Sequence, residues 1–544
     1  MQGAEYHFKQ DEQPGLPSSP FSPAHPLARR IGYAAVAVQI GITATLGNAV
    51  VAVNIGNLSG ALGVYVAEAN WLPTIYIAMY AWANLVLFKA RIQFGIPQVT
   101  SGLLILYALA ALGQFVVPGF GAAIVLRAVS GLTAAALTTL AVYYLFQSLS
   151  PKRRPLSLAI GIGFPQLGVS LARLFPVEML ALGGWRGLHL IEIALALMAL
   201  AAIWRLPLPP SIRQPAFEPL DLLTAVLLLP AISLLAGVLA QGRLLWWTDT
   251  PWLGWALAAS IPLFMAAIMI ERRRARPLLH FEWIGSIGIL RFAAVAFLVR
   301  LALAEQTYGS VGFLFSGGLT NDQLRGLFAV VSGAIVLGML VCAVTLSKSR
   351  LLYLVMSAAL SIALGAWLDS QGNNLTRIPQ LYFSQALIGF GTSLFVGPSL
   401  LYGFIRMMQR GPDVFVSFIV LFSVTQNIGS LAGSALLSSY QFASASYHTQ
   451  TLSEHLVAAD PQVTDRIRGG AAVVASAITD PAQRIRTGSA LLGRAEAGEA
   501  NVLAFNDVFQ LVALLALLTA IYVAYLVLLG HFRRRRQTPV GARL

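Results

Sequence analysis

Long apolar segments alternate with short polar segments along almost the whole chain. A helix that crosses a bilayer needs about 20 mainly apolar residues, and fourteen segments meet this requirement. They predict membrane-spanning helices over residues 31–55, 70–88, 98–117, 120–146, 155–177, 187–206, 220–241, 252–270, 286–313, 326–346, 351–368, 379–405, 414–438 and 506–530. The expected fold class is therefore an all-α polytopic membrane protein.

The composition supports lipid as the solvent of this chain. Of 544 residues, 57% are hydrophobic and only 11% are charged, whereas about a quarter of a soluble domain is charged. A soluble protein this poor in charge would expose large apolar patches and aggregate. Cys342 is the only cysteine, so an intrachain disulfide and a cysteine-based metal cluster are both excluded.

The basic residues are concentrated in alternate connections between the predicted helices. One set of connections and the C-terminal tail contain Arg29, Arg30, Lys89, Arg91, Lys152, Arg153, Arg154, Arg213, Arg272, Arg273, Arg274, Arg276, Lys348, Arg350, Arg406, Arg410 and Arg533–Arg536. The opposite set of short loops contains only Arg186, Arg243, Arg325 and Arg377. Since Lys and Arg mark cytoplasmic loops, residues 1–30 and 531–544 are expected to be cytoplasmic tails. The net charge of +14 then faces anionic lipid rather than nucleic acid.

One polar connection, residues 439–505, is much longer than the others and lies on the outer side. Apolar and polar residues mix there at roughly helical spacing, which predicts two or so amphipathic helices outside the membrane. Two roles are open for this segment: a cap folded back on the protein itself, or a docking surface for a partner.

The sequence contains none of the common enzyme motifs. It has no Walker lysine motif, no HExxH and no paired CxxC, and its seven histidines are scattered. No cofactor, no metal site and no enzyme activity are therefore expected. Moving a solute is the commonest function of such a chain.

Several motifs resemble the major facilitator superfamily, specifically the fourteen-span drug–proton antiporters of the EmrB/QacA type, and the likeness extends from about residue 31 to 531. VLRAVSG places Arg127 midway in helix 4, FPQLG resembles the antiporter motif of helix 5, and WRGLHLIE resembles the start of helix 6. The run LAFNDVFQ, after the long outer loop, is also typical of this branch. The resemblance implies that Arg127 takes part in proton coupling and that Pro165 and Gly168 form a helix-bend motif.

Two positions depart from the pattern of that family. Its helix 1 begins with an aspartate, for which this chain has Gly47, and its helix 2–3 loop has an aspartate where Ile92 stands. Lys89 and Arg91 keep the positive charge of that loop without the acid. The chain is therefore a divergent member, and its proton site cannot be copied from the family.

The resemblance implies a major facilitator fold with a six-helix bundle over 31–206, two added helices over 220–270 and a second six-helix bundle over 286–530. It implies export of amphiphilic drugs or aromatic compounds by proton antiport across the cell inner membrane. It also implies a periplasmic adaptor (membrane fusion) protein and an outer-membrane channel as partners, with 439–505 as the contact. Two alternatives stay open: a uniporter or symporter of a small organic solute, and a non-transporting scaffold or sensor derived from a carrier.

Charged residues within the predicted spans are the candidates for proton coupling, because charges at such depth are costly and usually functional. They are Glu192, Glu305, Arg127 and Arg300, with Arg173 near a helix end. Arg300 and Glu305 are five residues apart, a spacing that does not bring two side chains together on one helix. The alternative is that these charges form structural ion pairs between helices, or that Glu305 lies at the interface; Asp221 is placed at the interface as well.

Amide side chains within the spans are candidates for the substrate cavity. They are Asn48, Gln166, Gln385, Gln426 and Asn427. An unsatisfied amide in hydrocarbon is costly, so each is expected either to contact substrate or to hydrogen-bond between helices.

Overall fold

The computed structural model describes residues 12–14, 19–150, 153–457 and 459–537. These residues are 82% helical and contain no strand, which confirms the expected fold class. Fourteen helical segments are long and apolar enough to cross a membrane, so the predicted number of spans is confirmed too. Lys152 lies outside the described residues, as do the side chains of Arg154 and of Arg533–Arg536.

The first six spans are formed by consecutive helices. They are α1 (Leu27–Val53), α3 with α4 (Val66–Ala69 and Trp71–Phe94), α5 (Ile96–Val116), α6 (Phe120–Ser148), α7 with η3 and α8 (Arg154–Gly163, Phe164–Gln166 and Leu167–Ala172), and α11 (Gly187–Arg205). The short helices α2 (Ile55–Leu62), α9 (Val177–Leu180) and α10 (Leu182–Trp185) connect them. Within this group α6 packs against α1, α4 and α5.

The remaining eight spans begin with a helix pair that lies at the edge of the molecule. This pair is α12 (Pro219–Gln241) and α13 (Pro251–Arg272). The others are α15 with η4 and α16 (Ile287–Ala302, Leu303–Glu305 and Gly309–Ser316), η5 with α17 (Asn321–Leu324 and Arg325–Thr345), α18 (Leu351–Asp369), η6 with α19 (Ile378–Leu381 and Tyr382–Arg410), α20 (Phe415–Ser453) and α22 (Pro481–Gln537). The short elements α14 (Phe281–Ile284), η7 (Pro412–Val414) and α21 (Pro461–Val473) lie between them.

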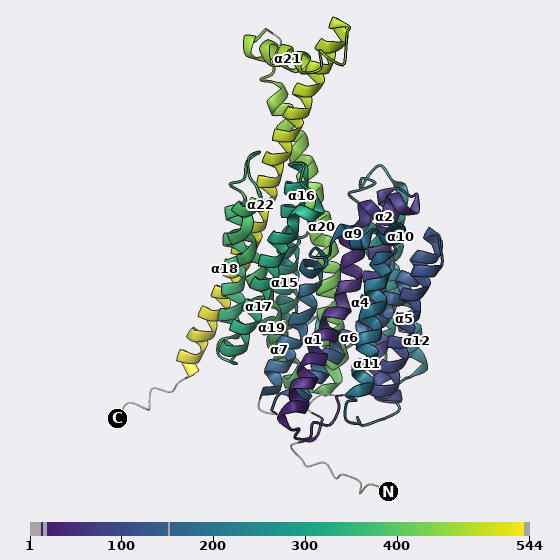
Figure 1. The fold of residues 1–544 in the computed structure, drawn as a ribbon. Coiled ribbons are helices and arrows are strands. Elements are labelled where there is room, and N and C mark those ends of the chain that lie inside the picture. Colours follow the sequence, from purple (N-terminus) through teal and green to yellow (C-terminus); the bar gives the residue numbers. More distant parts are fainter. Residues whose placement is uncertain (1–11, 15–18, 151–152, 458, 538–544) are drawn as a thin grey trace.

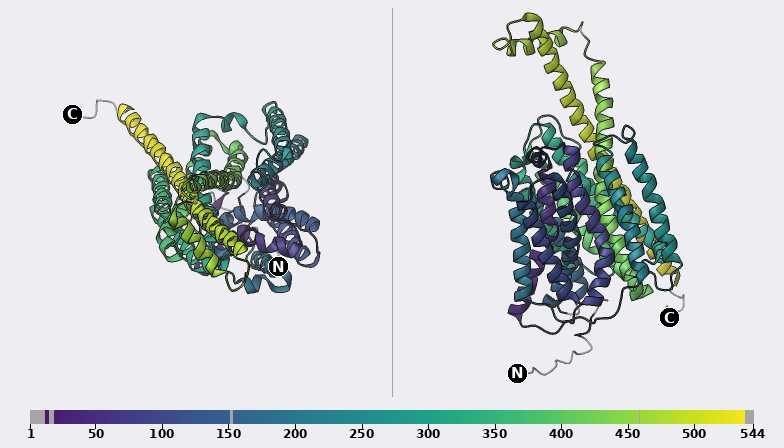
Figure 2. Two further views of the ribbon diagram at one scale, coloured as in Figure 1. Left: turned by 90° about the horizontal axis from the view of Figure 1, so that it is seen from above. Right: turned by 90° about the vertical axis from the view of Figure 1, so that its right-hand side faces the viewer.

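The two groups of helices stand side by side, with most of α1–α11 on one side and most of α15–α22 on the other; at their boundary α7 lies beside α19 and α20 beside α4 (Figures 1 and 2). α1 begins and α22 ends at the same face of the molecule, which we call the terminal face. At the opposite face α20 and α22 project far beyond the other helices and are joined through α21; we call this the hairpin face. α12 packs against α4 and α13, and less extensively against α20.

The outer connection differs from its prediction. We expected two or so amphipathic helices over 439–505 and a last span of 506–530; the segment is helical, but its helices are outward continuations of the two spans, α20 and α22, with α21 between them. α22 is one helix of 57 residues, about 85 Å long at 1.5 Å per residue, whereas the apolar core of a bilayer is about 30 Å thick. Asp507 of α22 binds His448 of α20 at 2.8 Å, and Gln441 donates to Asn501 at 2.8 Å. The outer hairpin (residues 439–505) is therefore built from extensions of two membrane helices, with α21 at its tip.

The helix around FPQLG is interrupted as its proline suggests. Pro165 has no amide hydrogen to donate to the preceding turn, and the α-helix gives way to a 3₁₀ turn over Phe164–Gln166. The hydroxyl of Thr45 in α1 donates to the carbonyl oxygen of Pro165 at 2.7 Å. A Cβ at Gly168 would lie 2.4 Å from Thr45 Oγ1, so only glycine permits this close contact between α1 and α8.

A network of charges joins the terminal-face ends of α4, α12 and α13. Asp221 is 2% exposed, and its carboxylate accepts from Lys89 Nζ at 2.6 Å and from Arg274 Nη2 at 2.8 Å. Arg274 also binds Glu218 at 2.9 Å and Glu271 at 2.7 Å. Asp221 lies in the first turn of α12, and the two cations that compensate its charge permit its burial there. Asp221 thereby supplies Lys89 with the acid that Ile92 does not provide.

Candidate functional site

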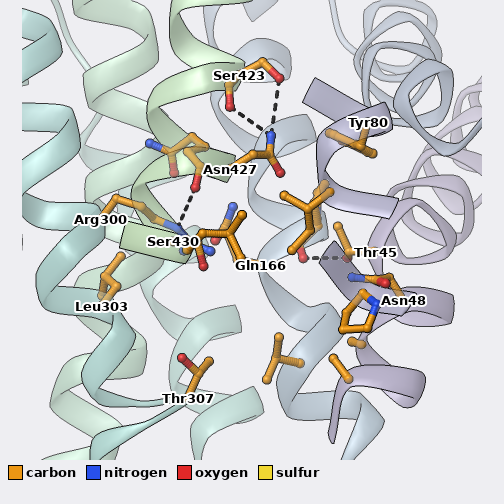
Figure 3. Close-up of a pocket in the computed structure, with 18 of the residues that line it drawn as sticks. Thr45, Asn48, Tyr80, Gln166, Arg300, Leu303, Thr307, Ser423, Asn427 and Ser430 are labelled. Atoms are coloured by element: carbon orange, nitrogen blue, oxygen red, sulfur yellow. Dashed lines mark hydrogen bonds between the residues drawn. The ribbon is translucent and has the colours of Figure 1, made fainter. Parts of the chain in front are cut away.

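A cavity of about 670 Å³ lies between the two groups of helices. Both groups contribute to its walls: α1, α4, α6, α7 and α8 from one side, and α15, α17, α19 and α20 from the other. Figure 3 shows Arg300 on one wall, Asn48 and Tyr80 on the opposite wall and Gln166 between them. Rings of Tyr76, Tyr80 and Phe422 also line the space. The site is thus large enough for a small organic molecule and offers it both polar and aromatic surface.

A buried ion pair lies behind the α1–α4 wall of this cavity. Arg127 in α6 and Glu192 in α11 are each 1% exposed. Arg127 Nη1 donates to both carboxylate oxygens of Glu192 at 3.1 Å, and Arg127 Nη2 donates to Asn48 Oδ1 at 2.8 Å. His189 Nδ1 lies 3.9 Å from Glu192 Oε2. The two charges predicted from the sequence therefore meet each other, between two helices, away from lipid and water.

Two residues of the cavity wall connect the ion pair to the cavity. Asn48 lines the cavity and accepts from Arg127. Tyr76 lines it as well, and the Arg127 guanidinium carbon lies 4.9 Å from the centre of the Tyr76 ring. A change in the charge of Glu192 can therefore affect these two lining residues through one intervening side chain, that of Arg127.

Gly47 of α1 lies directly against the ion pair. A Cβ at this position would lie 2.9 Å from Glu192 Oε1 and 2.5 Å from the Tyr107 hydroxyl. The carboxylate of Glu192 thus occupies space that a side chain at position 47 would need. The acid beside Arg127 is supplied by α11.

Arg300 lies on the opposite side of the cavity and has no acidic partner among the described residues. Its Nε donates to the carbonyl oxygen of Gln426 at 3.1 Å (Figure 3). Glu305 does not contact it: the helix that should contain both residues is interrupted, with α15 ending at Ala302 and a 3₁₀ turn over Leu303–Glu305. The sequence spacing thus predicted correctly that the two side chains do not pair within one helix.

Glu305 instead belongs to a second buried cluster, which includes Asp369 of α18. Gln385 Nε2 donates to Asp369 Oδ2 at 2.7 Å and to Glu305 Oε1 at 3.0 Å, and the Ser384 hydroxyl donates to Asp369 Oδ1. Glu305 is 0% and Asp369 2% exposed, and Glu305 Oε2 has no hydrogen-bond partner among the described residues. Glu305 is thus buried among helices, and it shares Gln385 with the last residue of α18.

The amide candidates divide between the cavity and this second cluster. Asn48, Gln166, Gln426 and Asn427 line the cavity. Asn427 Nδ2 donates to the Ser423 carbonyl oxygen at 2.8 Å (Figure 3), and Gln426 Nε2 has no partner among the described residues. Gln385 differs from its expected place: it is outside the cavity lining and bridges Glu305 and Asp369.

The sequence matches the description Major Facilitator Superfamily over residues 38–434. The chain belongs to the major facilitator superfamily. No curated protein matches the chain.

Solved structures of the superfamily resemble this protein in fold. The human organic anion transporter MFSD10 (TETRAN) is 12% identical, with a TM-score of 0.51 over 90% of this chain and 100% of that one. A bacterial homologue of the human drug peptide transporters PepT1 and PepT2 is 12% identical, with a TM-score of 0.53 over 93% and 99%. At this identity the likeness shows the fold alone.

Two functional candidates of this superfamily member escaped sequence reasoning. Asp369 ends α18, but the hydropathy pattern placed it first in an outer loop. Arg243 lines the cavity, although it was assigned to an outer loop. A signal existed in both cases, since each is a charge within three residues of an apolar span. Arg173, which the sequence did select as a charge near a helix end, lines the cavity as well.

Proposed function

We propose that this superfamily member is a secondary active exporter of amphiphilic drugs or aromatic compounds, driven by proton antiport with alternating access. The observation that carries the proposal is the buried Arg127–Glu192 pair, separated from a central cavity only by Asn48 and Tyr76. A carboxylate at this depth can hold a proton, and the cavity can hold a solute.

The geometry suggests how the proton and the solute are coupled at the ion pair. While Glu192 is ionised, it holds Arg127 Nη1 at 3.1 Å. A proton on Glu192 cancels that charge, so Arg127 keeps Asn48 and the Tyr76 ring as its remaining partners. The electrostatics of the cavity wall then change with the protonation of Glu192, which is the property that an antiporter needs.

The Glu305–Asp369 cluster is the proposed second proton-carrying group. Two carboxylates share the one amide of Gln385, and none of the ion pairs within the described part of the chain includes either acid. Two like charges this close in a low-dielectric interior repel strongly, and a proton on one of them removes the repulsion. Gln306, next to Glu305, lines the cavity and donates to the Gln385 carbonyl oxygen at 3.3 Å, which connects this cluster to the solute.

Alternating access would rock residues 31–206 against residues 286–530, with the added pair 220–270 at the edge. Contacts between these units exist at both faces. At the hairpin face Asn321 donates to Asn54 at 3.2 Å and accepts from Arg173. Toward the terminal face the rings of Phe88 and Phe415 are 5.0 Å apart. In the proposed cycle one set of contacts breaks while the other is kept.

The test begins with a screen of amphiphilic and aromatic compounds in an efflux-deleted bacterial strain that expresses the chain. For a compound that is exported, proton movement is followed in inverted membrane vesicles with a pH-sensitive dye. We expect proton release when the compound is added. The variant Glu192→Gln, which keeps the size of the side chain, should abolish both export and proton movement. Glu454→Gln is the control, because Glu454 is exposed in the outer hairpin and should leave both unchanged.

The outcomes of this test separate the alternatives. Export without proton movement would support a uniporter or a symporter instead of an antiporter. Absence of export from a chain that is inserted in the membrane would favour a scaffold or sensor. Retention of proton-driven export by Glu192→Gln would contradict the role of the ion pair.

We further propose that the protein lies in the cell inner membrane with its terminal face toward the cytoplasm. The outer hairpin would then stand in the periplasm and contact an adaptor protein that leads to an outer-membrane channel. Its support is the projection of α20 and α22 far beyond the other helices (Figure 1). Replacing residues 454–480 with a short glycine–serine linker should leave proton-coupled transport in vesicles intact and abolish drug tolerance of cells that co-express the adaptor. Unchanged tolerance would contradict adaptor docking at the tip.

A further inference from the structure

Arginines are the charged residues of the cavity lining, as far as the chain is described. Among the described residues that line it, Arg173, Arg243 and Arg300 are charged, and there is no aspartate or glutamate. Arg173 donates to Asn321 and lies 4.9 Å from the Phe328 ring centre. Arg243 donates to the Ser438 carbonyl oxygen at 3.2 Å and lies 4.2 Å from the Phe442 ring centre. Arg173 and Arg243 therefore contact neutral groups.

Arg300 is the cation best placed to bind a ligand. Only its Nε is used, by the Gln426 carbonyl oxygen, so the two terminal nitrogens remain for a bidentate contact, the geometry that a carboxylate or sulfonate offers. The side chain of Gln426 lines the same wall, and its Nε2 has no partner in the described part of the chain. The Ser430 hydroxyl lines that wall too. Arg300, Gln426 and Ser430 can thus all donate hydrogen bonds at this wall, and the described lining contains no carboxylate to accept them.

We infer that the cavity binds amphiphilic aromatic anions, with the anionic group on Arg300, Gln426 and Ser430. Uncompensated charge inside a membrane protein is costly, and a bound anion would offset it. Tyr76, Tyr80 and Phe422 line the same cavity and supply surface for the apolar rings of the ligand. A cationic drug would meet three arginines and no carboxylate, so the site discriminates against it. The inference rests on the proposed function in one respect, namely that the cavity is the substrate site.

The inference is tested by binding to the purified full-length protein in detergent, without a proton gradient. Three probes of matched shape are used in equilibrium dialysis: 2-naphthoate, its neutral amide 2-naphthamide, and the cation 2-naphthylmethylammonium. A hydrogen bond to a charged group contributes about 1.5–3 kcal/mol, so the anion should bind at least about tenfold more tightly than the amide. We expect no saturable binding of the cation.

Variants of Arg300 then test whether this residue causes the preference for the anion over the amide. Arg300→Gln should weaken 2-naphthoate about tenfold or more and leave 2-naphthamide unchanged, whereas Arg300→Lys should keep most of the preference for the anion. Arg377→Gln is the matched control, since Arg377 binds carbonyl oxygens in a loop at the hairpin face and does not line the cavity.

Equal binding of 2-naphthoate and 2-naphthamide by the unaltered chain would overturn the inference, and this comparison needs no variant to fold. Saturable binding of the ammonium probe, or an unchanged preference in a folded Arg300→Gln protein, would overturn it as well. Failure of the proposed function would look different: anions would bind with the expected preference, but no proton movement would accompany transport.

Discussion

The carboxylate of Glu192 in α11 lies against the backbone of Gly47 in α1, so close that a Cβ on residue 47 would be 2.9 Å from Glu192 Oε1. Glu192, which pairs with Arg127, and Gly47, the position in α1 that lacks an acid, are thus in direct packing contact. A side chain at residue 47 and the present position of Glu192 exclude each other.

The first prediction concerns this contact. Gly47→Ala should lower the free energy of unfolding by about 1–3 kcal/mol, because an extra methyl group overpacks a filled site. The matched control is Gly102→Ala in α5, where a Cβ would meet nothing within 4 Å; alanine is the better helix former there, so stability should stay equal or rise. Thermal unfolding of the two purified variants in detergent measures the difference, and equal midpoints would contradict the proposed crowding.

The second prediction concerns the charge network at the terminal face. Asp221→Asn should destabilise the protein by about 1–3 kcal/mol, because Lys89 loses its carboxylate and Arg274 keeps only Glu218 and Glu271. Lys89→Gln should have a smaller effect, since Lys89 is 15% exposed and Asp221 still binds Arg274. Thermal unfolding gives the order of the two variants, and the reverse order would show that Lys89 and not Asp221 holds the network together.

The third prediction concerns Asp369, which sequence reasoning did not select. If the Glu305–Asp369 cluster carries a proton, Asp369→Asn should abolish proton-driven export as Glu305→Gln does, while binding of solute to the cavity is retained. Asp322→Asn, at a site that is 39% exposed, serves as the control. Export and proton movement in inverted vesicles are the measurements, and normal proton-driven export by Asp369→Asn would remove this residue from the coupling mechanism.

The fourth prediction concerns pH and His280, which lies between α13 and α14. Burial lowers the pKa of His280, more than Asp413, Glu271 and Glu282 raise it, and Arg410 lowers it further. The unfolded chain therefore binds a proton at higher pH than the folded protein does, so this residue costs stability as the pH falls through the range below about 6.5. The stability of His280→Asn relative to the natural protein should rise between about pH 7 and pH 5. Thermal unfolding at several pH values measures this, and parallel curves for the two proteins would contradict it.

The sequence was sufficient to predict the fold class and the fourteen spans. Apolar length is a local property, and it is read directly from consecutive residues. That Glu192 and Glu305 belong to helices that are mainly apolar followed from the same pattern. Their partners did not, because Arg127–Glu192 and Gln385–Asp369 join residues from different helices, and nothing in the periodicity of one helix identifies its neighbour.

Boundaries of the spans were the weakest part of the prediction. Asp369 was placed in a loop because a charge ends an apolar run, although buried hydrogen bonds from Ser384 and Gln385 let the helix keep it. The continuity of the outer helices with the two spans was missed for the opposite reason. The polar sequence of the outer hairpin marks where the membrane ends, but a helix can continue into water when a second helix packs beside it, as α20 and α22 do.

The length of α22 has a mechanical consequence. The helix runs without a break from Pro481 at the outer tip to Gln537 at the terminal face, and midway it passes the interruption beside Glu305, where a Cβ on Gly309 would lie 3.0 Å from Phe509 Cε1. A continuous helix of this length can transmit motion between its two ends. A partner that binds the tip can tilt the part of α22 that packs beside the Glu305 turn, and a movement of that turn can displace the tip.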